Sequence, residues 1–174
     1  MSPAVRLARV ADADVCAAIY APYVADTAIS FEIEPPSPAE MAVRIANALE
    51  SHAWVVAEDE GRVIGYAYGG RLHTRGAYRW SCEVSVYVER GRGRTGVGRA
   101  LYATLFERLV ERGYLMAAAG MTLPNEASVA LHRAMGFEAV GVYRRIGYKH
   151  GGWHDVAWTQ RSLGEPAEPP AEPR

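Results

Sequence analysis

The sequence has few cysteines, almost no net charge and no long hydrophobic run. Its two cysteines, Cys16 and Cys82, lie far apart and form no Cys-x-x-Cys pair, which is typical of buried, reduced thiols in a cytoplasmic protein. The formal net charge of the 174 residues is -1, so no overall positive field attracts nucleic acid. We find no membrane span and expect no signal peptide. These absences predict a cytoplasmic protein with no nucleic-acid or membrane partner.

Several motifs that define other enzyme classes are also missing. The segment Gly91-x-Gly93-x-x-Gly96 matches a dinucleotide-binding fingerprint, but the next strand carries no acidic residue to hold a ribose. The same turn lacks the Gly-Lys-Ser/Thr ending of a nucleotide-triphosphate loop, and no Gly-x-Ser-x-Gly elbow of a serine hydrolase occurs. His150 and His154 lie four residues apart, a spacing that suits a metal site only on a helix. Two of the three residues between them are glycine, which disfavours a helix, so we expect no metal.

The remaining sequence predicts one domain over residues 1–163, a size that supports a full hydrophobic core. Apolar periodicity and cap signals, among them Ser37 with Glu40 three residues on, predict helices over 12–26, 37–51, 96–113 and 125–136. The same signals predict strands over 4–10, 53–58, 62–71, 77–89, 114–123, 138–148 and 153–163, with a turn at 59–61. The late strand–helix–strand crossover indicates a mixed sheet and an α/β (α+β) fold class. Residues 164–174 are rich in proline and glutamate, which predicts a disordered tail.

The stretch VYVERGRGRTGVGRALY, residues 86–102, reads as a strand, a glycine-rich turn and a helix. At such a helix start, unpaired N–H groups and the helix dipole stabilise an anion. Glycines at Gly96 and Gly98 let the backbone approach a ligand, and nearby arginines add charge-assisted hydrogen bonds. The pattern favours a pyrophosphate site, and a plain surface loop is the alternative.

Together with PNEASVALHRAMGF further along, this stretch resembles the acetyl-CoA site of the GNAT superfamily of N-acetyltransferases. The turn of that superfamily is usually Gln/Arg-x-x-Gly-x-Gly/Ala, and here glycine, Gly93, occupies the first position. The segments AYRWSCEVSVYV, RTGVG, LPNEASVALHRAMGF and YKHGGWHDVAW resemble phosphinothricin and methionine sulfoximine N-acetyltransferases. This resemblance covers Val5 to Leu163.

The resemblance implies a GNAT fold, with a central, mixed, mostly antiparallel twisted sheet flanked by about four helices. It implies acetyl-CoA as co-substrate, no metal, and a homodimer in which residues 149–155 lie near a shared pocket. It also assigns the cofactor contacts to a strand end, the glycine turn and the start of a later helix. The implied cofactor-binding residues are Val86, Tyr87, Val88, Arg94, Thr95, Gly96, Val97, Gly98, Arg99 and Asn125.

Two side chains are candidates for proton transfer. Glu83 lies in an apolar strand, where burial raises a carboxyl pKa and makes it a better base near neutral pH; a solvent-facing glutamate is the alternative. The resemblance aligns Glu83 with the base proposed for the family. His132 stands where the superfamily often has a tyrosine that protonates the leaving thiolate, a task imidazole can perform. A packed or capping histidine is the alternative for His132.

The resemblance also implies the acceptor, the α-amine of a small amino-acid-like molecule of the phosphinothricin or methionine sulfoximine/sulfone type, acetylated directly in a ternary complex. The implied substrate-binding residues are Phe31, Arg75, Tyr78 and Lys149. Each has an ordinary alternative as core or solvated charge, and the family often has an aromatic where Leu72 stands and a cation where His73 stands.

Other activities stay open at this point. The acceptor could be a protein N-terminus, a polyamine or an aminoglycoside, although the segment LHTRGAYRW has no acidic residue to attract the last two. A non-catalytic acyl-CoA-binding sensor is the alternative outside the enzymes.

Overall fold

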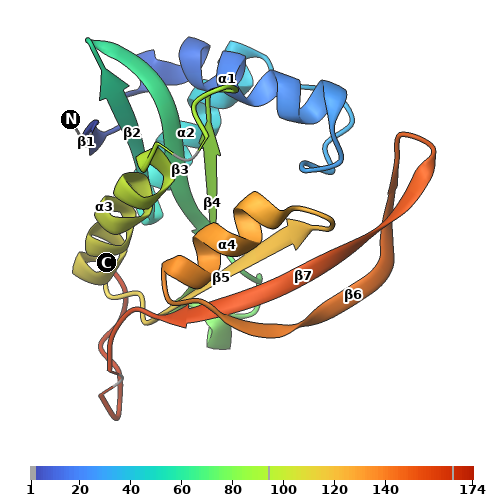
Figure 1. Ribbon diagram of the computed structural model, residues 1–174. Helices are drawn as coiled ribbons and strands as arrows, with labels where there is room; N and C mark the ends of the chain where they lie inside the picture. The colour runs from blue at the N-terminus through green and yellow to red at the C-terminus, as the bar shows by residue number, and fades with distance from the viewer. Residues whose placement is uncertain (1–2, 94, 166) are drawn as a thin grey trace.

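The apolar strands assemble into one seven-stranded sheet with helices on both faces (Figure 1). The computed structural model describes residues 3–93, 95–165 and 167–174. The strands are β1 (Ala4–Leu7), β2 (Ala53–Asp59), β3 (Arg62–Arg71), β4 (Ser81–Val88), β5 (Met116–Thr122), β6 (Glu138–Lys149) and β7 (Gly152–Ser162). The helices are α1 (Ala13–Asp26), α2 (Pro38–Ser51), α3 (Val97–Glu111) and α4 (Glu126–Ala134), with short 3-10 turns η1 (Val10–Asp12) and η2 (Gly76–Tyr78). Among these described helices, none combines the length and apolarity needed to cross a bilayer.

The sheet opens at its centre. Its order is β1-β2-β3-β4-β5-β7-β6, and every neighbouring pair is antiparallel except β4 and β5. That parallel pair matches only residues 81–83 with residues 116–118, although β4 continues to Val88 and β5 to Thr122. The two strands therefore diverge beyond Glu83 and leave a gap between their ends (Figure 1). The predicted mixed, mostly antiparallel α/β fold is confirmed.

Two hydrophobic cores hold the layers together. One lies between the sheet and α3 and includes Cys82, Leu101 and Leu105, and the other packs α1 and α2 on the opposite face and includes Cys16. Both cysteines are free and fully buried, which confirms the interpretation as buried thiols. Side chains of β4 alternate between these cores, because successive residues of a strand point to opposite faces.

The sequence located most elements correctly. Ser37 caps α2 as predicted, since its Oγ accepts from the Glu40 N–H while the Glu40 carboxylate accepts from the Ser37 N–H. The predicted strand over 77–89 is too long, because residues 76–78 form η2 and β4 begins only at Ser81.

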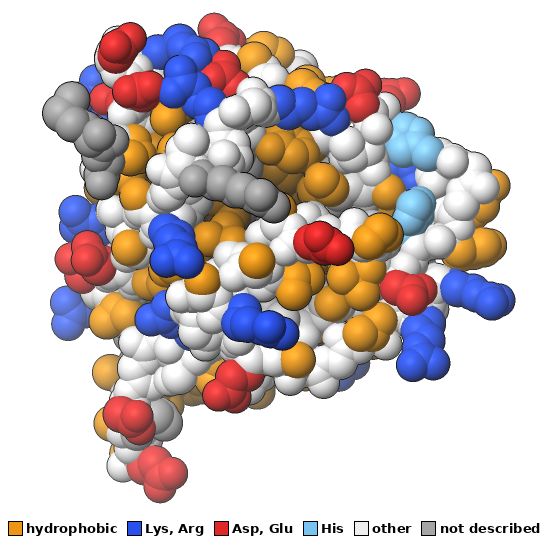
Figure 2. Space-filling view, in the orientation of Figure 1, with side chains coloured by type: hydrophobic (Ala, Val, Ile, Leu, Met, Phe, Trp, Pro, Cys, Tyr) orange, Lys and Arg blue, Asp and Glu red, His pale blue; other side chains and the backbone are white. Residues whose placement is uncertain are grey.

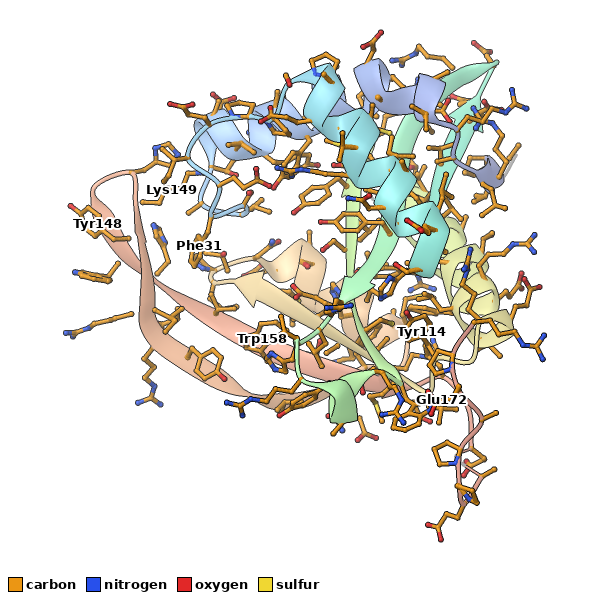
Figure 3. The ribbon with its side chains drawn as sticks, turned by 180° about the vertical axis from the view of Figure 1, so that it is seen from behind. Phe31, Tyr114, Tyr148, Lys149, Trp158 and Glu172 are labelled. Carbon is orange, nitrogen blue, oxygen red and sulfur yellow. The ribbon has the colours of Figure 1, made fainter. Side chains whose placement is uncertain are left out.

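The β6–β7 hairpin extends beyond the rest of the sheet and reaches the segment after α1 (Figures 1 and 3). The described residues beyond β7 contain neither helix nor strand, and the chain ends beside the C-terminal end of α3 (Figure 1). The disorder predicted for residues 164–174 stays a prediction, although Ala171, Glu172 and Arg174 form hydrogen bonds with the folded domain.

Candidate active site

The end of β4 turns main-chain groups into the gap. The Glu89 N–H donates to the Ile64 carbonyl at 2.8 Å, and the antiparallel register pairs Tyr87 with Tyr66. Hydrogen-bonded and non-bonded pairs alternate in such a ladder, so Tyr87 bonds to β3, whereas Val86 and Val88 direct their N–H and C=O groups toward β5. The Val88 carbonyl already accepts a hydrogen bond from the Tyr23 hydroxyl at 2.5 Å. An extended ligand in the gap therefore meets the main-chain N–H and C=O of Val86 and the N–H of Val88.

A narrow cavity of ≈ 50 Å³ lies in this gap. Val86 and Tyr87 of β4 line it, together with Asn125 and His132 from the α4 region. In the view of Figure 2, the surface is hollowed between α1 and α4, with hydrophobic side chains at the bottom of the hollow. The fold thus brings together residues of the predicted cofactor site that lie far apart in the sequence.

The N-terminus of α3 has no side-chain cap. Its N-cap residue, Gly96, has φ +85 and makes no capping hydrogen bond, whereas Ser37 caps α2 and Asn125 caps α4 by accepting from the Ser128 N–H at 3.2 Å. The first intrahelical bond of α3 joins the Ala100 N–H to the Gly96 carbonyl. The N–H groups before Ala100 consequently point out of the helix, where an anion is stabilised by them and by the helix dipole.

Gly96 and Gly98 have different roles in this turn. Gly96 adopts a left-handed conformation that favours glycine. A Cβ at Gly98 would come within 3.0 Å of Leu131 Cδ2, so the absence of a side chain lets α3 pack closely on α4. The sequence suggested only an approach of backbone to ligand at Gly98, and that contact stays a prediction beside the packing role.

Two of the four arginines of the turn, Arg90 and Arg92, are already paired. Arg90 donates to Asp26 at 3.0 Å, and Arg92 pairs with Asp59 and Glu89. Arg99 is exposed and forms no ion pair within the described residues. Arg94, predicted to bind the cofactor, lies outside the described part of the chain, and the Thr95 hydroxyl donates to the Arg92 carbonyl at 2.7 Å.

Glu83 stands where β4 and β5 begin to diverge. It is half-buried and pairs with Gly70 on β3 and Ala118 on β5. Burial raises the pKa of its carboxyl above the ordinary range, and the nearby His73 opposes this rise in pKa. The pKa of the Glu83 carboxyl therefore shifts upward, the direction that the sequence predicted for a carboxyl in an apolar strand.

His132 is almost fully buried, with 3% of its surface exposed. Its Nδ1 lies 2.8 Å from the Ser128 carbonyl oxygen, which only accepts, so the hydrogen-bond network assigns the proton to Nδ1. Its Nε2 lies 3.0 Å from the Tyr102 hydroxyl, which then donates to it. Burial also lowers the pKa of His132. No sequence pattern pointed to Tyr102, which lies 30 residues away on α3.

Arg75 and Tyr78 line a second cleft, of ≈ 410 Å³, between η2, β3 and the end of α2. Gly70, the partner of Glu83, and His73 also line it. The cleft therefore adjoins the candidate base and carries the cationic and aromatic side chains expected of an acceptor site.

Phe31 and Lys149 lie elsewhere, where the β6–β7 hairpin meets the segment after α1 (Figure 3). Phe31 covers Gly147, leaving no room for a side chain there. Lys149, the only lysine of the chain, is 5% exposed, and its Nζ donates to the carbonyls of Val24 at 2.6 Å and Ser30 at 2.7 Å. Desolvation lowers the pKa of Lys149. The acceptor contacts predicted for both residues stay predictions.

Comparisons with known proteins identify the family. The family described as acetyltransferase (GNAT) domain matches residues 5–158. A phosphinothricin N-acetyltransferase of Streptomyces viridochromogenes is 39% identical over 95% of this chain and 90% of its own length. An L-methionine sulfoximine/L-methionine sulfone acetyltransferase of Pseudomonas paraeruginosa is 34% identical over 94% and 96%.

The fold comparison gives the same family. A crystal structure of a phosphinothricin acetyltransferase from Sinorhizobium meliloti in complex with AcCoA superposes with a TM-score of 0.91 and 39% identity, covering 100% of this chain and 94% of that one. The chain belongs to the GNAT family of acetyltransferases and is an N-acetyltransferase.

Proposed function

We propose that this N-acetyltransferase transfers acetyl from acetyl-CoA to the α-amine of a small amino-acid-like acceptor of the phosphinothricin or methionine sulfoximine/sulfone type. The observation that carries the proposal is the position of Glu83, between the gap of the sheet and the cleft that contains Arg75 and Tyr78. The relatives named above support the acceptor class.

The cofactor would lie along the gap. The main-chain N–H and C=O of Val86 and the N–H of Val88 suit the pantetheine amides, as an added strand would use them. The uncapped start of α3 suits the pyrophosphate, and Arg99 is positioned at its rim. Asn125 and His132 line the cavity in this gap.

A substitution at Gly96 tests the pyrophosphate site. We expect Gly96→Val to weaken acetyl-CoA binding at least about 10-fold, because a β-branched residue is strained at φ +85 and distorts the first turn of α3. Gly93→Ala is the control, since its backbone is not left-handed and a Cβ there meets nothing within 4 Å. Titration calorimetry with acetyl-CoA measures both, and equal affinities would place the pyrophosphate elsewhere.

The chemistry is a direct transfer in a ternary complex. Glu83 takes a proton from the acceptor ammonium, and the freed nitrogen attacks the thioester carbonyl. The adduct then loses its second N–H proton to water, and the C–S bond breaks as the amide forms. The thiolate then takes a proton, for which His132 is the candidate donor. Because the neutral ring holds its proton on Nδ1, this role requires the doubly protonated ring, whose fraction falls as pH rises.

We also propose a cytoplasmic homodimer. The edge strand β6 and the start of β7 expose large apolar side chains, namely Val140, Val142, Tyr143, Ile146, Tyr148 and Trp153. Tyr148 projects from the hairpin tip in Figure 3. An apolar edge strand invites pairing, and a second copy covering it would also lie near the 149–155 segment.

An acceptor panel tests the proposed function. Free-thiol release from acetyl-CoA is measured with phosphinothricin, methionine sulfoximine, methionine sulfone, spermidine, an aminoglycoside and a short peptide. We expect fast release with the first three amines. Release with only the others would contradict the acceptor class, and acetyl-CoA binding without any release would favour a sensor.

A further inference from the structure

The end of the chain is bound to one wall of the acceptor cleft. The Glu172 carboxylate accepts two hydrogen bonds from the Arg79 guanidinium, at 2.6 Å from Nε and 2.7 Å from Nη2. Arg79 lies over the Trp80 ring at 3.8 Å, and the Trp80 indole N–H donates to the Ala171 carbonyl at 2.8 Å. Arg79 also donates to the Gly76 carbonyl at 3.0 Å. Through Arg79, the tail therefore fixes the turn η2.

The last residues have a second anchor on the opposite side of the cleft. The Arg174 N–H donates to the Arg112 carbonyl at 2.8 Å. The Arg112 guanidinium in turn donates to the carbonyls of Leu49 and Glu50 at the end of α2. Gly113 makes room for the chain, since a Cβ there would lie 3.2 Å from Pro173 Cα. Figure 3 shows Glu172 near Tyr114, whose side chain lines the cleft.

These two anchors connect the two walls of one cleft. The wall from η2 carries Arg75, Tyr78 and Arg79, and the opposite wall includes Ser51 and His52 at the end of α2. We propose that residues 171–174 form a strap across this end of the cleft, and that Glu172 is a positioning residue for acceptor binding. The proposal rests on the proposed function, which assigns the cleft to the acceptor.

The strap acts locally. The side chains of Arg79 and Glu172 are 46% and 67% exposed, and ion pairs this exposed contribute little to global stability. The residues they hold, however, belong to an irregular segment between β3 and β4 that has few other tethers within the described chain. Fixing this segment before the acceptor binds reduces the ordering that binding must otherwise provide.

Kinetics of two tail variants test the strap. Glu172→Gln removes the charge with little change in shape, and a chain ending at Gly164 removes the strap entirely. We expect the acceptor KM to rise about 3-fold in the first variant and about 10-fold in the second. Turnover (kcat) and acetyl-CoA affinity stay within about 2-fold, because the cofactor site lies at the other end of α3. Glu168→Gln, the same change at an exposed tail position, is the matched control.

Hydrogen exchange of the amides in residues 72–80 gives a readout that needs no acceptor. We expect faster exchange there in both strap variants and native exchange in Glu168→Gln. Native exchange in the strap variants would overturn the strap, and faster exchange with an unchanged acceptor KM would overturn the positioning role. If the native enzyme acetylates no amine of the panel, the proposed function fails, and exchange alone decides whether the strap exists.

Discussion

Replacing Glu83 with glutamine lowers kcat by about 10²–10⁴-fold, the range that a general base contributes. Glutamine keeps the size and polarity of the side chain but cannot take a proton from the acceptor ammonium. Acetyl-CoA affinity stays unchanged, because none of the cofactor contacts proposed above uses this carboxylate. Thiol release under saturating acetyl-CoA, with calorimetry of cofactor binding alongside, measures the two effects separately.

The pH dependence of kcat/KM follows from the ionisation of the Glu83 carboxyl. Burial raises the pKa of Glu83, so kcat/KM of the native enzyme rises with pH through a value above the ordinary range of a glutamate and levels off once the carboxylate is ionised. Because folding raises this pKa, the ionised form stabilises the folded state less than the protonated form does. Glu83→Gln therefore unfolds at the same or a higher temperature than the native protein at neutral pH.

Glu107→Gln is the matched control for this experiment. Glu107 lies on the exposed face of α3, so the same chemical change there leaves kcat and its pH profile unaltered. Native turnover in Glu83→Gln would remove the assignment of the base, and equal losses in both variants would point to a general effect of charge rather than to a role in proton transfer.

The order of elements follows from local signals in the sequence. Period-two apolar strands and the Ser37–Glu40 capping box each act within a few residues, so the sequence alone reveals them. The position of Glu83 in an apolar strand likewise predicted its desolvation. These features depend on neighbours in the chain rather than on tertiary contacts.

The contacts that the sequence did not reveal join distant segments. The bond between Tyr102 and His132 exists because Gly98 lets α3 approach α4, and no local pattern encodes that approach. The sequence of the tail does not single out Glu172, which is one of several glutamates next to prolines. Its partner, Arg79, is 93 residues away, so only the folded chain shows which glutamate is paired.

Lys149→Met lowers the free energy of unfolding by about 3 kcal/mol, since it leaves two buried carbonyls without a donor and removes charged hydrogen bonds. Lysine suits this position because its compact ammonium has three donors, two of which bind Val24 and Ser30. In a chain whose other basic residues, histidines aside, are all arginine, Lys149→Arg is also destabilising, because the larger planar guanidinium does not fit the same two carbonyls. Urea unfolding measures both variants.

Arg144→Met is the control that distinguishes loss of the Lys149 hydrogen bonds from a general effect of substitution in the hairpin. Arg144 lies on the same strand, β6, and is exposed, so its substitution changes the unfolding free energy by less than about 0.5 kcal/mol. The sequence resemblance instead placed Lys149 at the acceptor. Native stability of Lys149→Met together with a 10-fold or larger rise in acceptor KM, a loss of about 1.4 kcal/mol in binding, would establish that role. A loss of stability with a native acceptor KM shows that the ammonium joins the hairpin to the segment after α1.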